Sequence, residues 1–272
     1  MNLNKLKLFT DQLGNTETMP VLFVGHGSPM NAIEQNEFTA GWQSKSKSLP
    51  TPKAILCISA HWETKGTFVT AMDLPPTIHD FGGFPQALFD VQYPAPGSPE
   101  LAEETKRIIL KTEVGLDNNW GLDHGTWSVL KRFYPEADIP VIQLSLDYYR
   151  EPQYHYELAR ELQALRNKGI LIIGSGNMVH NLRALDWGRA NTGYDWALEA
   201  NEKFKELIMQ NDHHQLTGYK KLGSAVQMAV PTPEHFLPLL YALALKSEKD
   251  EISFFNDKPV MGSLTMTSLQ IG

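Results

Sequence analysis

Cysteine is almost absent from this sequence, because Cys57 is the only one among 272 residues. A chain with a single cysteine cannot form an intramolecular disulfide, so nothing here indicates an oxidising compartment. Cys57 lies inside an apolar run at residues 54–58, where a free cysteine is most often a small core residue. The sequence therefore favours a cytoplasmic protein with a buried thiol.

Long apolar runs and basic blocks are also missing. No stretch approaches the roughly 18 apolar residues of a membrane span. The first 20 residues lack the continuous apolar core, roughly 7–15 residues long, of a signal peptide. With 24 basic and 31 acidic residues the net charge is -7, which disfavours a nucleic-acid backbone as partner. We therefore expect neither nucleic acid nor membrane as a partner.

Several catalytic signatures are absent as well. The sequence contains no H-E-x-x-H motif and no zinc-finger spacing of cysteines and histidines. Ser28 and Ser175 lie beside glycines, but neither stands in a G-x-S-x-G motif. A serine hydrolase is therefore disfavoured.

Short apolar runs bounded by Gly, Pro or Ser predict strands buried on both faces. They lie at residues 21–25, 54–60, 141–146 and 170–174, with weaker candidates at 67–70, 225–230 and the final GSLTMTSLQIG. Helical periodicity predicts helices from a cap at Ser98 to Gly115, over residues 153–167 and over 195–210. This alternation predicts an α/β fold: a single domain over residues 1–272, with a mixed, largely parallel central sheet covered by helices on both faces.

Histidines follow the predicted strands. His26 and His61 each stand where an apolar run ends, and His180 comes a few residues after a third run. Ligands bind beyond the carboxyl ends of the strands in sheets of this kind, and histidine is the commonest metal ligand. We expect these imidazoles to meet in one cleft.

The other histidines are weaker candidates. Thr232 could cap a helix with His235 in its first turn, although Pro238 favours a kink or a later start. His124 lies in a glycine-flanked turn before a short helix, and His79 lies in a proline-rich segment, 72–98, whose length suggests function. His155, His213 and His214 are expected to be exposed and are assigned no role.

Six motifs in this order resemble one known family. The chain is similar to the bacterial and plant 4,5-DOPA extradiol dioxygenases of the class III extradiol ring-cleavage superfamily, from about residue 20 to its end. The motifs are GHGSP (25–29), SAHWE (59–63), HDFGGFP (79–85), DHGTW (123–127), GSGNMVHN (174–181) and TPEHFLPL (232–239).

The resemblance implies a metal bound by His26, His61 and His235. Fe(II) is the metal implied for activity, although the wider superfamily has a glutamate where this chain has His235. Non-haem iron oxygenases commonly use two histidines and one carboxylate, whereas three histidines equally suit zinc. A site holding either Fe(II) or Zn(II) is therefore expected.

The resemblance further implies that His180 is a catalytic histidine and His124 a second active-site histidine. His180 could alternatively be a fourth metal ligand. Candidate walls of the substrate cavity are Trp62, Phe81, Phe84 and Trp127. The alternative role for these four side chains is ordinary core packing. Glu234 is not expected to share an ion with His235, since neighbouring helical residues face about 100° apart.

The implied activity is extradiol cleavage of a catechol such as L-DOPA at the 4,5 position, with O₂ as second substrate. The alternative is a zinc-dependent hydrolase with the same three histidines, since zinc lowers the pKa of bound water to about 7. A metal-binding protein without catalysis is a third hypothesis.

Overall fold

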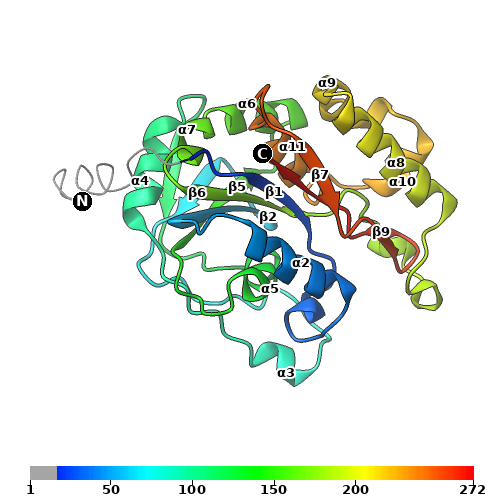
Figure 1. The fold of residues 1–272 in the computed structure, drawn as a ribbon, viewed down its shortest axis with the longest axis horizontal. Coiled ribbons are helices and arrows are strands. Elements are labelled where there is room, and N and C mark those ends of the chain that lie inside the picture. The colour runs from blue at the N-terminus through cyan, green and yellow to red at the C-terminus, as the bar shows by residue number, and fades with distance from the viewer. Residues whose placement is uncertain (1–16) are drawn as a thin grey trace.

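An eight-stranded sheet forms the centre of the computed structural model, which describes residues 17–272 (Figure 1). The signal-peptide interpretation rests largely on residues 1–16, which lie outside the described residues. The sheet contains β1 (Val21–Gly25), β2 (Ala54–Thr64), β3 (Thr67–Thr70), β4 (Val114–Asp117), β5 (Val141–Asp147), β6 (Ile170–Gly176), β7 (Ile252–Phe255) and β10 (Ser268–Ile271). A second, two-stranded sheet pairs β8 (Pro259–Val260) with β9 (Leu264–Thr265).

The strand order is β4-β3-β5-β2-β6-β1-β10-β7. The central strands β5, β2, β6 and β1 run parallel to one another. At the edges, β10 pairs antiparallel with β1 and β7, and β3 pairs antiparallel with β5. The predicted mixed, largely parallel sheet is confirmed.

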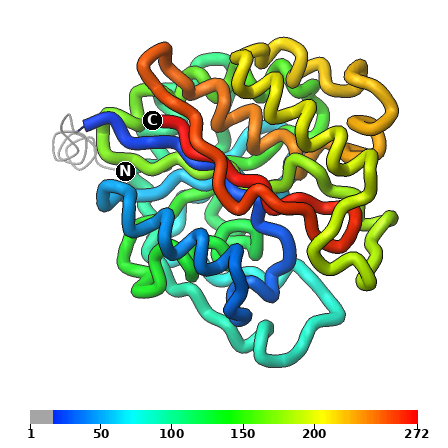
Figure 2. Tube along the Cα trace, turned by 45° about the vertical axis from the view of Figure 1, so that its right-hand side comes forward, coloured from blue at the N-terminus to red at the C-terminus, as the bar shows by residue number. Residues whose placement is uncertain are grey.

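Helices cover both faces of the sheet (Figures 1 and 2). They are α2 (Glu37–Ser48), α3 (Gln86–Phe89), α4 (Pro99–Ile108), α5 (His124–Phe133), α6 (Pro152–Arg160), α7 (Gln163–Arg166), α8 (Asp195–Met209), α9 (His213–Thr217), α10 (Ser224–Ala229) and α11 (Leu237–Ala244). Within residues 17–272, no helix is both long and apolar enough to cross a membrane.

Alternating strand residues build two separate cores. Val21 and Phe23 of β1 pack into the core under α4, α6, α8 and α11, whereas Leu22 and Val24 pack into the core under α2 and α5. Successive strand side chains point to opposite faces, so continuous apolar runs are what a doubly covered sheet requires. Cys57 is buried in the second core, as expected.

Helix ends differ from the predictions in two places. Ser98 caps α4, but this helix ends at Ile108 instead of reaching Gly115, because residues 114–117 pair with β3. The helix predicted over 153–167 divides into α6 and α7, and α8 matches its predicted range closely. Pairing between distant segments decides such boundaries, and local periodicity does not report it.

One predicted strand is wrong, and one helix starts late. Residues 225–230 lie mostly in α10, where Ala225, Val226 and Ala229 are buried at helical spacing. A short apolar run does not by itself distinguish helix from strand. Thr232 caps no helix, because α11 begins at Leu237 with Pro238 in its first turn. The alternative of a later start is therefore confirmed.

Candidate metal centre

Five histidines gather at the edge of the sheet where the carboxyl ends of the central parallel strands lie. His26 follows β1, His61 lies in β2, His124 opens α5, His180 follows β6 and His235 precedes α11. Their ring centroids lie 5.0 Å apart for His26 and His61, 5.2 Å for His26 and His235, 5.0 Å for His61 and His235, 3.8 Å for His61 and His124, and 3.4 Å for His180 and His235. The structure thus brings together every histidine that the sequence assigned to the site.

The sequence suggested that His61 follows its strand. In the structure β2 continues to Thr64, so His61 lies inside the strand. The pairing of β2 with β5 shifts register between Ile58 and Glu63, so His61 lies inside an irregularity of the strand. Such irregularities redirect side chains and are common beside active sites.

The segment before α11 approaches β6 closely enough to place His235 beside the sheet. The backbone oxygen of His235 accepts a hydrogen bond from the Asn177 N–H at 2.9 Å. A Cβ atom on Gly176 would lie 2.2 Å from that oxygen, so only glycine permits this approach. Glycine at the end of β6 therefore helps to position His235.

Hydrogen bonds fix the tautomer of His26. The Ser175 hydroxyl donates its single proton to the Gly125 carbonyl at 2.5 Å. The Nδ1 atom of His26 lies 3.0 Å from the same hydroxyl oxygen and must therefore be the donor. In neutral His26 the remaining nitrogen, Nε2, then carries a lone pair.

His61 and His235 are held in the same way by carboxylates. Nδ1 of His61 lies 3.4 Å from Oδ2 of Asp80, and Nδ1 of His235 lies 3.2 Å from Oε1 of Glu234. An ionised carboxylate only accepts hydrogen bonds, so His235 donates from Nδ1 and its Nε2 has a lone pair. Asp80 lies at ion-pair distance from Nδ1 of His61 and favours a proton on that nitrogen. Metal-binding histidines characteristically donate their second ring N–H to such an acceptor.

The spacing of three of the rings suits a cation between them. Nε2 of His26 and Nε2 of His61 lie 3.2 Å apart, close enough to face one ion. Three imidazoles bound through Nε2 at about 2.1 Å to one tetrahedral ion have ring centroids about 5 Å apart. The three distances among His26, His61 and His235 are 5.0, 5.2 and 5.0 Å. These residues fit a metal ion.

The distances between donor atoms give two groups among residues 17–272, and neither contains all three of these histidines. One group with all donor atoms within 4.8 Å is His26, His61 and His124, and a second is His180, Glu234 and His235. The rings of His26, His61 and His124 are less evenly spaced, at 5.0, 3.8 and 5.8 Å. The even spacing of His26, His61 and His235 therefore fits tetrahedral angles better.

The predicted incompatibility of Glu234 with His235 rested on a helix that the structure does not form. Residues 231–236 precede α11, and Glu234 turns back to accept from both His235 and the Thr232 hydroxyl. Glu234 supports His235, and a carboxylate oxygen of Glu234 also lies within 4.8 Å of a ring nitrogen of His180.

Burial and crowding keep these imidazoles neutral. Burial is the largest cause that lowers the pKa of His26 and of His235 well below the usual value, and the neighbouring histidines lower both further. The pKa of His61 falls to about 3 and that of His180 to about 4, again mainly through burial. Neutral imidazole is the form that binds metals.

Asp80 is a site residue that the sequence did not single out. Its Oδ1 accepts the backbone N–H of His124 at 2.9 Å, and its Oδ2 lies 3.0 Å from Nδ1 of the same residue. Burial alone would raise the pKa of Asp80, but the hydrogen bonds from His124 outweigh it and lower the pKa. Asp80 thus orients His61 and His124 together, and its position in the long segment 72–98 was the available signal.

The four predicted wall residues divide into two kinds. The ring of Phe81 lies 5.5 Å from that of His124, and Phe84 packs on Phe81 at 5.3 Å. Trp127 is fully buried, lies behind Phe81 and donates its indole N–H to the Ile78 carbonyl. Trp62 is buried and stacks on Trp120. Phe81 therefore borders His124 and carries Phe84 against it, while the tryptophans have packing partners of their own.

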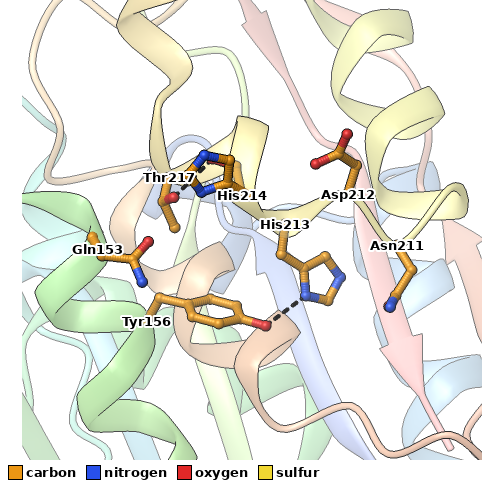
Figure 3. A pocket seen from close by; sticks show the side chains of 7 residues that line it. All are labelled: Gln153, Tyr156, Asn211, Asp212, His213, His214 and Thr217. Atoms are coloured by element: carbon orange, nitrogen blue, oxygen red, sulfur yellow. Dashed lines mark hydrogen bonds between the residues drawn. The ribbon is translucent and has the colours of Figure 1, made fainter.

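The expectation that His155 and His213 are exposed is wrong. His155 is fully buried and His213 is 7% exposed. Nδ1 of His155 lies 3.1 Å from the hydroxyl of Tyr241, and Nδ1 of His213 lies 2.8 Å from that of Tyr156 (Figure 3). His213 lines a separate hollow between α6 and α9.

Fold and site together define an α/β protein with a buried histidine centre fitted to a metal ion. The chain matches the family described as the catalytic LigB subunit of aromatic ring-opening dioxygenase over residues 20–262. It belongs to this family and is therefore an oxidoreductase of the extradiol dioxygenase class, which confirms the resemblance seen in the motifs.

Relatives extend over nearly the whole chain. The "4,5-DOPA dioxygenase extradiol" of Escherichia coli K12 is 48% identical over 97% of this chain and 99% of the relative. A protein of the same name from Beta vulgaris is 36% identical over 86% of this chain and 90% of the relative. A crystal structure of an uncharacterized E. coli K12 protein superposes with a TM-score of 0.80 at 42% identity, covering 93% of this chain and 100% of that one.

Proposed function

We propose that this enzyme cleaves the ring of a catechol such as L-DOPA at the 4,5 position with O₂. The observation that carries the proposal is the even spacing of the rings of His26, His61 and His235, 5.0–5.2 Å apart, each with its Nδ1 beside an acceptor. The names of the E. coli and Beta vulgaris relatives support the choice of substrate.

His26, His61 and His235 would hold Fe(II). A bound Fe(II) supplies the electron transfer between catecholate and O₂ that no side chain here provides. The surrounding protein contributes orientation: Ser175, Asp80 and Glu234 each hold one ligand ring in place.

His124 and His180 would move protons. Because His124 donates its Nδ1 proton to Asp80, its Nε2 has a lone pair that can accept the proton of a catechol hydroxyl. His180 stacks on His235 at 3.4 Å with an interplanar angle of 7°. From there it would accept a proton and then return it to the opened ring.

The apolar border would hold the aromatic ring and exclude water. Phe81 and Phe84 face the substrate in this proposal, while Trp127 and Trp62 support the elements behind them. Residues 1–272 would form one catalytic domain acting in the cytoplasm on a small molecule, without nucleic acid or membrane.

Anaerobic loading with Fe(II), followed by L-DOPA and oxygen, tests the proposal. We expect stoichiometric O₂ uptake and a yellow ring-fission product, and neither with His61→Ala. Absence of O₂ uptake by fully iron-loaded protein with L-DOPA or a simple catechol would contradict the proposal.

A zinc hydrolase is the second candidate, favoured by one observation: the three evenly spaced ligands are all histidines. Ester hydrolysis by the zinc-loaded protein, without oxygen uptake by the iron-loaded one, would support this alternative.

A further inference from the structure

The N-terminus of α5 holds a fully buried carboxylate with partners on two strands. Asp123 caps α5 through the Thr126 N–H at 3.1 Å. Its Oδ1 also accepts the Ser59 hydroxyl at 2.6 Å, and its Oδ2 accepts Nε2 of Gln143 at 2.6 Å. Ser59 in turn accepts the backbone N–H of His61 at 3.2 Å. The cap of this helix is therefore joined to the strand that carries a predicted ligand.

Gly125 brings the same turn against the ligand itself. A Cβ atom on Gly125 would lie 2.5 Å from the Ser59 hydroxyl oxygen and 2.9 Å from Cδ2 of His61. The Gly125 carbonyl accepts from Ser175, whose oxygen holds Nδ1 of His26. The first turn of α5 thus touches the supports of two predicted ligands.

We propose that Asp123 is a positioning residue that sets the geometry of the metal centre by locking α5 to β2 and β5. The inference rests on the proposed function, because the centre it positions is the proposed iron site. Capping alone does not require this network: Ser98 caps α4, a helix of equal length, by accepting the Leu101 N–H at 3.1 Å.

Asp123→Asn tests this link between α5 and the two strands. The substitution preserves the shape of the side chain and its capping oxygen. The new amide N–H₂ would face Nε2 of Gln143, placing donor against donor. Gln143 cannot correct this by flipping its amide, because its Oε1 already accepts the backbone N–H of Asp123 at 3.1 Å. A second variant, Asp123→Asn with Gln143→Glu, restores acceptors opposite both donors.

Co(II) serves as the probe, because its visible absorption reports ligand geometry without catechol or oxygen. For Asp123→Asn we expect a changed absorption spectrum and a Kd for Co(II) raised roughly 10- to 100-fold. The double variant should return the spectrum and most of the affinity. Ser98→Ala, which removes a cap at the sheet edge, should lower the melting temperature but leave Co(II) binding unchanged.

An unchanged Kd and spectrum in Asp123→Asn would overturn the inference and reduce Asp123 to a helix cap. Failure of the double variant to recover would also overturn it, because the hydrogen-bond pattern would then not be the cause. If the unaltered protein fails to bind Co(II) at all, the proposed function itself fails, which is a distinct result.

Discussion

Two groups of buried histidines lie in this protein, and only one resembles a reaction centre. At the metal centre, the rings of His26, His61 and His235 gather evenly, with centroids 5.0–5.2 Å apart. Among the helices, His155 and His213 each bond one tyrosine hydroxyl, and their Nε2 atoms are buried without a partner.

Burial and lowered pKa do not separate the two groups. Burial lowers the pKa of both His155 and His213 to about 4, close to the value of about 4 for His180. Perturbed titration therefore marks desolvation at all of these positions. The gathering of three evenly spaced rings, each with an acceptor beside its Nδ1, is what distinguishes the metal centre.

The largest effect should come from removing a converging ring. His26→Ala or His61→Ala should abolish both metal binding and turnover, because each leaves two imidazoles for the ion. Metal content by mass spectrometry and O₂ uptake check this. Full metal content in either variant would mean that convergence does not identify the ligands.

His180→Ala should affect turnover more than metal. Loss of a proton-transfer group costs roughly 10²- to 10⁴-fold in kcat, while the three proposed ligands remain. Metal titration beside steady-state kinetics separates the two effects. Should the variant lose metal as completely as His61→Ala, His180 is a ligand and the assignment made here is wrong.

Asp80→Asn should have an intermediate effect, because it weakens the acceptor behind His61 and His124 together. We expect metal affinity or kcat to fall roughly 10- to 100-fold. The control is Asp250→Asn, which alters a carboxylate paired with buried Arg166 at 2.7 Å, away from the histidines. Equal loss of metal in both variants would indicate general destabilisation instead.

The features that the sequence predicts are those whose pattern lies within a few neighbouring residues. His26 and His180 follow apolar runs at glycine-rich turns, and that pattern lies within a few residues. The link between Asp80 and His124 spans 44 residues and starts in a segment without periodicity, so no local pattern reports it. The extra strand β4 depends on pairing with β3 and was missed for the same reason.

The burial of His155 was in fact available from the sequence. It lies three and seven residues before Leu158 and Leu162, on the apolar stripe of the predicted helix. The prediction of an exposed His155 is wrong because it counted only the leucines in the apolar stripe. The break between α6 and α7, in contrast, has no comparable signal in the run of helix-favouring residues.

His155 and His213, the histidines among the helices, should affect the stability of the fold and not catalysis. The pH dependence of the unfolding free energy tests this. Burial outweighs the opposing effect of Asp147 and lowers the pKa of His155 from 6.5 to about 4. Below pH 6.5 the unfolded chain therefore binds a proton that the folded one does not, so this contribution is complete above pH 6.5 and is lost as pH falls toward 4. Compared with His155→Gln, the native protein should lose on the order of 2 kcal/mol of unfolding free energy between pH 7 and pH 5. Denaturant unfolding of both proteins measures it, and equal slopes with pH would refute the assignment.

Tyr156→Phe should give the smallest effect and test whether the two groups are independent. The change removes the hydroxyl that lies 2.8 Å from Nδ1 of His213, beside the hollow of Figure 3. Because this hollow is open and water can replace the hydroxyl, the loss of unfolding free energy should be about 1 kcal/mol. Co(II) affinity and kcat should not change, because no acceptor behind a converging ring is altered. A fall in metal affinity would show that the helical histidines are coupled to the centre, and the separation between the two groups would then be wrong.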